Sequence, residues 1–168
     1  PNLWTFHLRK GLKRHGDGKE LTATDVGHSI WRNKNDQRSA QKHNTRAIKS
    51  WKIIDKHTIQ LTTKKPIAPL LSYLFDILFI TAKDLYDKHG DRTADRKYPL
   101  GWGPYMLKDV KIGERMVLEK NPHWPDIKKS TPDRVIFQRV KEPEARVTGL
   151  LNGEFQIAPL SPPIWFPG

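Results

Sequence analysis

The sequence predicts an α+β fold in which antiparallel strand pairs and short helices alternate along the chain. Trp4, Phe6 and Leu8 are separated by polar residues, as in a strand that buries one of its two faces. Val26 and Ile30 lie four residues apart, which places them on one face of a helix. Since both periods occur in short segments bounded by turn residues, we expect mixed or antiparallel sheets with short helices.

The first predicted helix begins with a capping signal. Thr22 stands three residues before Asp25, so its hydroxyl can accept a hydrogen bond from the Asp25 backbone. The Asp25 carboxylate would lie near the positive end of the helix dipole, which stabilises it there. The polar residues 33–45 that follow have no apolar period, and we expect a loop or a frayed helix.

Turn residues and apolar spacing place the remaining elements. Residues 55–57 are expected to join the strands of a hairpin, and Gly90 is expected to end a helix. The charged residues 91–99 are expected to be irregular. The other predicted elements are, in order, strands around 51–53 and over 58–62, helices over 70–75 and 82–89, strands over 105–110, 115–120 and 135–137, a helix from Pro143 to Gly153, and a last strand over 155–158.

The charge and the composition narrow the classes of function. Lysine and arginine number 30 against 18 aspartate and glutamate residues, for a net charge of +12. Such a charge attracts nucleic acid or anionic lipid, but it also arises from a solvated basic surface. The sequence has no cysteine, which excludes disulfides. Its longest nearly apolar stretch, residues 67–82, is too short to span a bilayer.

No arrangement of residues indicates an enzyme, and no catalytic residue is proposed. The seven histidines include no pair at a metal-binding spacing, so we expect no metal site and no cofactor. Residues 101–106 begin like a dinucleotide-binding loop. However, Met106 stands where the third glycine belongs, and Pro104 lacks an N–H for a phosphate. We interpret this segment as a structural turn.

Several segments, in the same order and spacing, resemble the peptide and nickel type (family 5) of extracytoplasmic solute-binding proteins of ABC importers, which includes oligopeptide- and dipeptide-binding proteins. Residues 101–105 resemble that family's Gly-Thr-Gly-Pro-Tyr turn, with Trp102 in place of the threonine. The other matching segments are residues 4–13, 15–18, 21–26, 48–50, 55–59, 65–71, 145–147 and 150–154. One such segment is a weak signal, but their shared order identifies the chain as similar to this family.

The resemblance implies a fold, a role and a location. The chain would form part of a two-lobed fold of the type II periplasmic binding proteins, with residues 1–160 as a partial lobe one that includes its small subdomain. Residues 161–168 would lead toward the remainder. The implied role is capture of a peptide or a similar small solute in the periplasm or another extracytoplasmic space, and delivery to a membrane ABC permease. No catalysis and no nucleic-acid binding are implied.

The resemblance also suggests two ligand-binding residues. Trp102 would line the cleft side of the Gly101 turn. Gln41 aligns with the position at which some relatives carry a ligand-facing aromatic residue. For both residues, plain packing or solvent exposure is the alternative explanation.

Two other functions stay open at this point. The first is a basic interaction module that binds nucleic acid or an anionic surface, with Trp31, Trp51 and the nearby basic residues as its face. The second is a degenerate, non-functional fragment whose core is completed by another chain. Because the chain covers about a third of a typical family member, the surface left by a missing lobe would then favour self-association.

Overall fold

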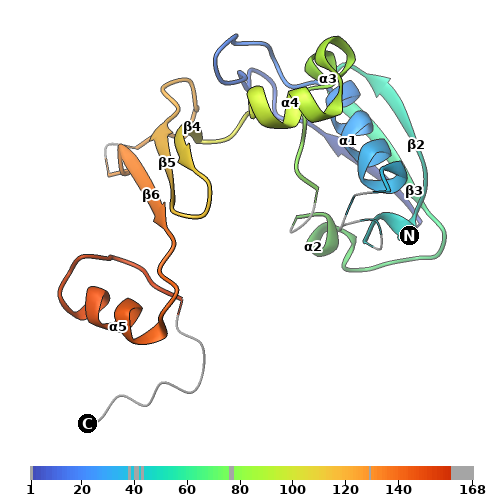
Figure 1. Cartoon of the computed structure of the whole chain (residues 1–168). Helices are drawn as coiled ribbons and strands as arrows, with labels where there is room; N and C mark the ends of the chain where they lie inside the picture. Colours follow the sequence, from blue (N-terminus) through green and yellow to red (C-terminus); the bar gives the residue numbers. More distant parts are fainter. Residues whose placement is uncertain are drawn as a thin grey trace. The chain divides into compact units, whose positions relative to one another are not determined.

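The computed structural model describes residues 2–37, 39, 42, 44–75, 78–128 and 130–159. It confirms the α+β class, with short helices and two three-stranded sheets in the orders β1-β3-β2 and β4-β5-β6. The chain divides into two compact units (Figure 1): unit 1 comprises Pro1–Met106 and Lys120–Thr131, and unit 2 comprises Leu107–Glu119 and Pro132–Gly168. Within the described part of the chain, no helix is long and apolar enough to cross a lipid bilayer.

Unit 1 contains most of the regular structure. Its elements are, in chain order, β1 (Leu3–His7), α1 (Ala23–Asn35), the 3-10 turn η1 (Asn44–Ala47), β2 (Ile48–Asp55), β3 (Thr58–Thr63), α2 (Leu70–Phe75), α3 (Lys83–His89) and α4 (Asp91–Lys97). The predicted first strand, hairpin and two middle helices are therefore confirmed, with bounds that differ by a few residues.

The first sheet buries one face only. In the antiparallel register, Trp4 lies opposite Leu61, and Leu61 lies opposite Trp51. Phe6 and Ile59 form the next such row. Helix α1 packs on this apolar face with Val26 and Ile30, both of which are buried, and Figure 1 shows it alongside β2 and β3. The approach is close, because a Cβ on Gly27 would lie 3.0 Å from the Trp51 indole nitrogen.

The predicted cap of α1 is confirmed. Thr22 and Asp25 form a capping box in which Asp25 Oδ2 accepts hydrogen bonds from the Thr22 backbone N–H at 3.1 Å and from the Thr22 hydroxyl at 2.7 Å. Asp25 Oδ1 also accepts a hydrogen bond from the Lys83 backbone N–H at 3.0 Å. One carboxylate therefore caps α1 and holds the first residue of α3.

The expectation that residues 91–99 are irregular is wrong, because α4 occupies Asp91–Lys97. Ala94 is the buried residue among those of this helix whose burial is described, and the helix has no apolar period that a sequence pattern could show. Its stability comes from contacts across the fold. Gly90, with φ of 72°, ends α3 as predicted and accepts the first backbone hydrogen bond of α4 from Ala94 at 2.9 Å.

The Gly101 turn is fixed by hydrogen bonds from two distant segments. The His15 Nε2 atom lies 3.0 Å from the Gly103 carbonyl, which accepts its hydrogen bond, and the Gly101 N–H donates to His15 Nδ1 at 3.4 Å. The Asn121 side-chain amide donates to the same Gly103 carbonyl at 2.9 Å. The structure thus supports the interpretation of this segment as a structural turn.

Arg14 is the largest fully buried side chain of unit 1, with 1% of its surface exposed. It forms ion pairs with Asp17 and with Asp84, the latter at 2.5 Å. Lys19 also pairs with Asp84, at 2.6 Å. Hydrogen bonds from Arg14 lower the pKa of both aspartates below the usual range. The network ties the segment after β1 to α3.

Phe6 and Leu8 also border an open apolar groove of about 720 Å³ in unit 1. Leu71, Leu78 and Ile80 line it as well. Leu71 and the neighbouring Phe79 are exposed to solvent. Unit 1 therefore presents a continuous apolar surface beside its core.

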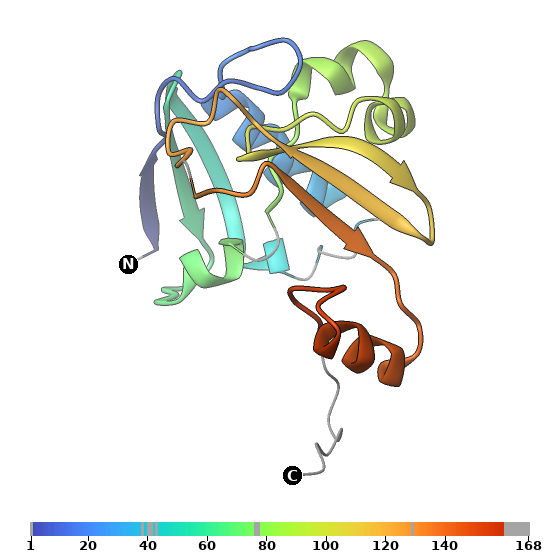
Figure 2. The ribbon, with the colours of Figure 1, turned by 90° about the vertical axis from the view of Figure 1, so that its left-hand side faces the viewer.

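Unit 2 contains most of β4 (Tyr105–Lys111) and β5 (Arg115–Lys120) and all of β6 (Arg134–Gln138) and α5 (Pro143–Leu151) (Figure 2). These elements confirm the predicted strands and the helix that starts at Pro143. The expected strand over 155–158 is wrong, because these residues form no strand. Instead, the Phe155 ring packs against Gly149 of α5, so closely that a Cβ on Gly149 would overlap it. The apolar side chain of Phe155 therefore packs against α5 and takes no part in a sheet.

We predict that Gly149→Ala destabilises unit 2. The added methyl group must displace the Phe155 ring, and such overpacking costs about 1–3 kcal/mol, which exceeds the gain in helix propensity. The measurement is the free energy of unfolding in urea. Gly103→Ala is the matched control, because a Cβ there meets nothing within 4 Å. Adding Phe155→Ala to Gly149→Ala should remove most of the destabilisation that the added methyl group causes. If the two substitutions instead lower the free energy of unfolding additively, the explanation is contradicted.

We predict that Asp84→Asn weakens unit 1 and reduces its sensitivity to acid. The lowered pKa of Asp84 means that its stabilising effect is complete above its unfolded pKa of about 3.9 and is lost as the pH falls below that value. At neutral pH the substitution should lower the free energy of unfolding by about 1–2 kcal/mol. The expected effect is modest because the Asp84 side chain is 41% exposed and solvent screens its ion pairs. Urea unfolding at neutral pH and near pH 3 measures both effects. An equal acid-induced loss in the two proteins would contradict the assignment.

Candidate functional site

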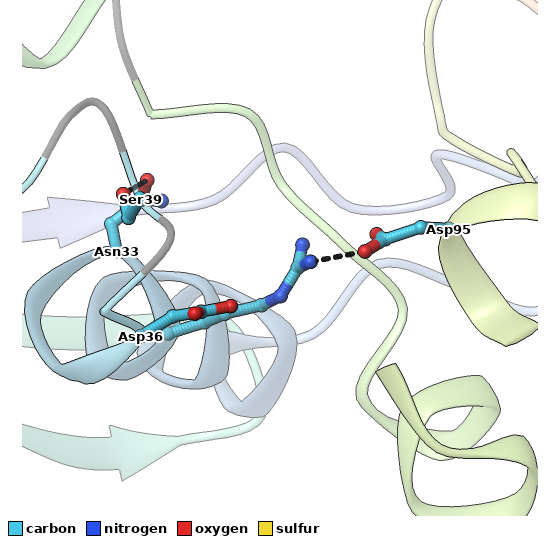
Figure 3. Close-up of a pocket in the computed structure, with 5 residues that line it drawn as sticks. Asn33, Asp36, Ser39 and Asp95 are labelled. Carbon is cyan, nitrogen blue, oxygen red and sulfur yellow. Dashed lines mark hydrogen bonds and ion pairs between the residues drawn. The ribbon is translucent and has the colours of Figure 1, made fainter. Parts of the chain in front are cut away.

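A polar cavity of about 280 Å³ lies at the C-terminal end of α1 (Figure 3). We call it the α1 pocket, and the residues that line it are Arg32, Asn33, Asp36, Ser39 and Asp95. Four of them belong to α1 or to the residues directly after it, and Asp95 comes from α4. The pocket therefore lies within unit 1, where the ion pair between Arg32 and Asp95 joins α1 to α4.

Arg32 is held rigidly by two partners. Its Nη2 donates to Asp95 Oδ2 at 2.5 Å, and its Nη1 donates to the Tyr86 hydroxyl at 3.0 Å. The guanidinium also lies 4.5 Å from the centre of the Tyr86 ring, in a cation–π contact. Asp95 thus neutralises Arg32, and Tyr86 fixes the orientation of its guanidinium plane.

Tyr86 closes this arrangement by donating its hydroxyl proton to Asp95 Oδ1 at 2.5 Å. Burial raises the pKa of Tyr86, and the hydrogen bond to Asp95 raises it further. The phenol therefore stays protonated at neutral pH and acts as a donor to Asp95. Arg32, Tyr86 and Asp95 together link α1, α3 and α4.

The other side of the α1 pocket is made of neutral and acidic groups. The Asn33 amide nitrogen donates to the Ser29 carbonyl at 2.9 Å, and its amide oxygen accepts from the Ser39 hydroxyl at 3.3 Å. Figure 3 shows Asn33 and Ser39 directed toward one another. Asp36 caps the end of α1, and its backbone N–H donates to the Arg32 carbonyl at 2.9 Å. Because Asp36 lies at the negative end of the helix dipole, this side of the pocket is unfavourable for anions.

Of the two predicted ligand-binding residues, Gln41 lies outside the described residues. Its role stays a prediction.

Trp102 is described, and it is largely buried. Its indole N–H donates to the Lys19 carbonyl at 2.9 Å, and its ring packs against Leu21 and Ala82. It lines a second polar cavity, of about 390 Å³, whose other lining residues include Arg14 and Asp84. It does not line the α1 pocket. A contact between Trp102 and a ligand stays a prediction.

The residues of the α1 pocket were not predicted from the sequence. Arg32 stood out only as part of a basic surface, and Asp95 lies in a stretch that was expected to be irregular. No spacing rule brings them together, since 63 positions separate the two residues. Among the described residues, no group of three or more potential ligands could hold a metal ion.

Comparison with known proteins identifies the family. The profile described as "Bacterial extracellular solute-binding proteins, family 5 Middle" matches residues 2–167. The dipeptide-binding protein of Escherichia coli is 29% identical over 95% of this chain, and the periplasmic oligopeptide-binding protein OppA of Salmonella typhimurium is 26% identical over 96%. These matches cover 34% and 33% of the two relatives, so the chain spans about a third of their length.

Solved structures of similar proteins also match nearly all of this chain and about a third of their own length. NikZ from Campylobacter jejuni, in complex with Ni(L-His), matches 90% of this chain with a TM-score of 0.76 and 29% identity, over 30% of its own chain. DppA from Helicobacter pylori, an ABC transporter-associated periplasmic binding protein in complex with the peptide STSA, matches 92% with a TM-score of 0.73 and 26% identity, over 34% of its own chain.

OppA from Burkholderia pseudomallei has a TM-score of 0.80 at 22% identity, over 92% of this chain and 34% of its own, which shows the likeness in fold. The expected relation to the two-lobed binding-protein fold is confirmed for the part that this chain spans. Since the family profile covers nearly every residue, the chain belongs to the bacterial extracellular solute-binding proteins, family 5.

Proposed function

We propose that this chain is part of the substrate-binding component of an ABC importer and captures peptides or similar small solutes. The observation that carries the proposal is the family match over residues 2–167. Relatives named for dipeptide and oligopeptide binding, together with a solved relative that holds the peptide STSA, support a peptide as ligand.

In this proposal, residues 1–160 form part of lobe one, including its small subdomain, and residues 161–168 lead toward the remainder. The protein acts in the periplasm or another extracytoplasmic space, as the names of its relatives suggest. It passes its solute to a membrane permease and catalyses no reaction. Ligand contact with both lobes would stabilise a closed form, which is how binding is coupled to delivery.

The α1 pocket is the proposed contribution of unit 1 to ligand contact. It is a concave polar site with a rigid arginine, and Gln41 follows its lining residue Ser39 by two positions in the sequence. Trp102 is proposed as a second contact through the cavity that it shares with Arg14. Both assignments concern residues whose positions are fixed by their neighbours, which limits the entropy lost on binding.

The basic interaction module is the less favoured alternative. Such a module needs exposed aromatic residues among its basic residues. Of the two tryptophans suggested for that face, Trp51 packs against the core, whereas Trp31 is exposed. A single exposed tryptophan is a poor platform for stacking successive bases.

We predict that trialanine binds the chain weakly and with little dependence on salt. In ¹H–¹⁵N spectra, trialanine should shift the resonances of residues 32–39 in a saturable way. Its affinity should change by less than about twofold between low and moderate salt, whereas the affinity of a protein that binds through many phosphate contacts would fall about 10³-fold. Ser39→Ala should weaken the peptide, and Thr5→Ala, on the polar face of the first sheet, is the control. Oligonucleotide binding without any peptide response would contradict the proposal.

We also predict self-association of the chain through the apolar groove. The groove is open. Leu71, which lines it, is 57% exposed, and Phe79, which lies in sequence between the lining residues Leu78 and Ile80, is 72% exposed, so burial against a second copy removes apolar surface from water. Sedimentation equilibrium should show a concentration-dependent mass. The double variant Leu71→Ser and Phe79→Ser should shift it toward the monomer, whereas Ile112→Ser, in the exposed β4–β5 turn of unit 2, should not. A monomer at every concentration would contradict this prediction.

A further inference from the structure

The positive charge of the chain is distributed unevenly between its two units. Unit 2 contains seven basic and seven acidic residues, so the whole net charge of +12 belongs to unit 1. Within unit 1, residues 37–54 contain no aspartate or glutamate, and neither do residues 56–75, yet the two stretches together contain eight lysines and arginines. Most of the excess positive charge of unit 1 therefore comes from these two stretches.

The fold brings the two stretches together at one end of the first sheet. Ile48, the first residue of β2, pairs with Thr63, the last residue of β3. The Lys64 N–H donates to the Ala47 carbonyl at 2.9 Å beside this pair. Lys34, in the last turn of α1, donates through its Nζ to the Ile48 carbonyl at 2.8 Å. Three segments of the chain thus bring basic residues to the same place.

We call the basic residues at this end of the sheet the basic cluster, and its members are Lys34, Lys42, Arg46, Lys49, Lys64 and Lys65. Lys42 belongs to it because its carbonyl accepts a hydrogen bond at 3.1 Å from the hydroxyl of Thr45, the neighbour of Arg46. Every member except Lys34 is exposed to solvent. Lys34 is half-buried, and its ammonium group is held by the carbonyls of Ile48 and Lys49, so its charge stays within the cluster.

The basic cluster differs from the rest of unit 1 because its charges are not neutralised. Elsewhere in this unit, ion pairs with aspartate or glutamate are formed by Arg9, Arg14, Lys19, Arg32, Lys56 and Lys83. Among the described residues, no member of the basic cluster forms an ion pair with a carboxylate. Like charges that the fold holds together repel one another, so a surface of opposite charge that approaches them is attracted.

The chemistry of the basic cluster favours lipid head groups over single-stranded nucleic acid. Such a nucleic acid is held by stacking on aromatic residues as well as by charge, and Trp51, which lies next to the cluster in β2, packs against the core. Attraction to anionic lipids needs only charge, and clusters of about four to eight basic residues are typical of it. The choice of a membrane also rests on the proposed function, because a protein that delivers solutes to a permease works beside a bilayer.

From these observations we propose that the basic cluster attaches unit 1 to the anionic surface of a lipid bilayer. The ammonium and guanidinium groups contact the phosphates of the head groups, and no side chain enters the hydrocarbon. Each basic residue near such a surface strengthens the attachment about fivefold, and salt weakens it. The attachment adds a docking surface to solute capture, and it keeps the protein near the permease that receives the solute.

The first test is sedimentation of the whole chain with lipid vesicles. One kind of vesicle contains about two-thirds phosphatidylcholine and one-third phosphatidylglycerol, and the other kind contains phosphatidylcholine alone. At low salt the chain should sediment with the anionic vesicles but not with the neutral ones, and moderate salt should release it because the charges are screened. Equal binding to both kinds of vesicle, or no binding to the anionic kind at low salt, would overturn the proposal.

A pair of matched variants separates the basic cluster from the net charge. The double variant Lys49→Gln and Lys64→Gln removes two exposed charges of the cluster, and its partition coefficient for the anionic vesicles should fall about thirtyfold. The control is the double variant Lys10→Gln and Lys13→Gln, which removes the same charge from two exposed lysines. Its partition coefficient should fall less than about twofold, because charges beyond a Debye length contribute little.

The control lysines lie at the other end of the sheet from the cluster. Lys13 forms a backbone bridge with Glu20, and the Glu20 carboxylate pairs with Lys56 in the turn that joins β2 to β3. Strand β3 separates this turn from the basic cluster by about 17 Å, more than the Debye length of about 10 Å. Equal losses in the two double variants would show that net charge alone attracts the vesicles, and the proposal would be wrong.

The outcome is distinguishable from that of the peptide experiment, because the vesicle experiment contains no solute. A response to trialanine without vesicle binding leaves peptide capture in place and refutes the role of the basic cluster. Vesicle binding without a response to trialanine supports the lipid contact, while peptide capture fails. If oligothymidylate displaces the chain from the vesicles at an equal concentration of phosphate groups, the cluster prefers nucleic acid and the proposal is overturned.

Discussion

The sheet β1-β3-β2 is apolar on one face and polar on the other, and the rest of unit 1 is organised to cover the apolar face. Trp4, Leu61 and Trp51 form one row across the three strands, and α1 packs over the sheet with Val26 and Ile30. The direction of α1 is set where it begins, by the capping box of Thr22 and Asp25. The sheet and α3 fix the position of the start of α1. The direction of the helix then places its C-terminal end at the α1 pocket.

A second set of constraints is polar. Arg14 and His15 are adjacent in sequence, and they hold different segments: Arg14 binds Asp84 of α3, and His15 binds the Gly101 turn. Trp102, in that turn, lies 5.6 Å from the Arg14 guanidinium, measured to the ring centre. Trp102 is larger than the threonine of the family's turn, and it is accommodated by stacking against the guanidinium of Arg14, which is buried. Buried polar groups of this kind specify one arrangement because each has only one set of partners.

The sequence predicted those elements whose signals are local. The cap at Thr22, the hairpin around residues 55–57 and the stop at Gly90 each depend on neighbouring residues, and all three are confirmed. Helix α4 was missed because its stability depends on Ala94 burial and on Asp95 contacts with Arg32 and Tyr86. Phe155 alternates with polar neighbours as a strand residue would, but it packs on Gly149 instead. The α1 pocket could not be predicted either, since its residues come together only after α1 and α4 have packed.

Helix α4 is short, and a seven-residue helix is not stable alone in water. Its order depends on the contacts that Asp95 and Ala94 make with the rest of unit 1. Local opening of α4 should therefore need less free energy than global unfolding of the sheet, and it should occur more often. Each opening removes one wall of the α1 pocket and releases Arg32 from its counter-ion. The time that the pocket spends formed is thus governed by the docking of one small helix, and a solute held there would lengthen it.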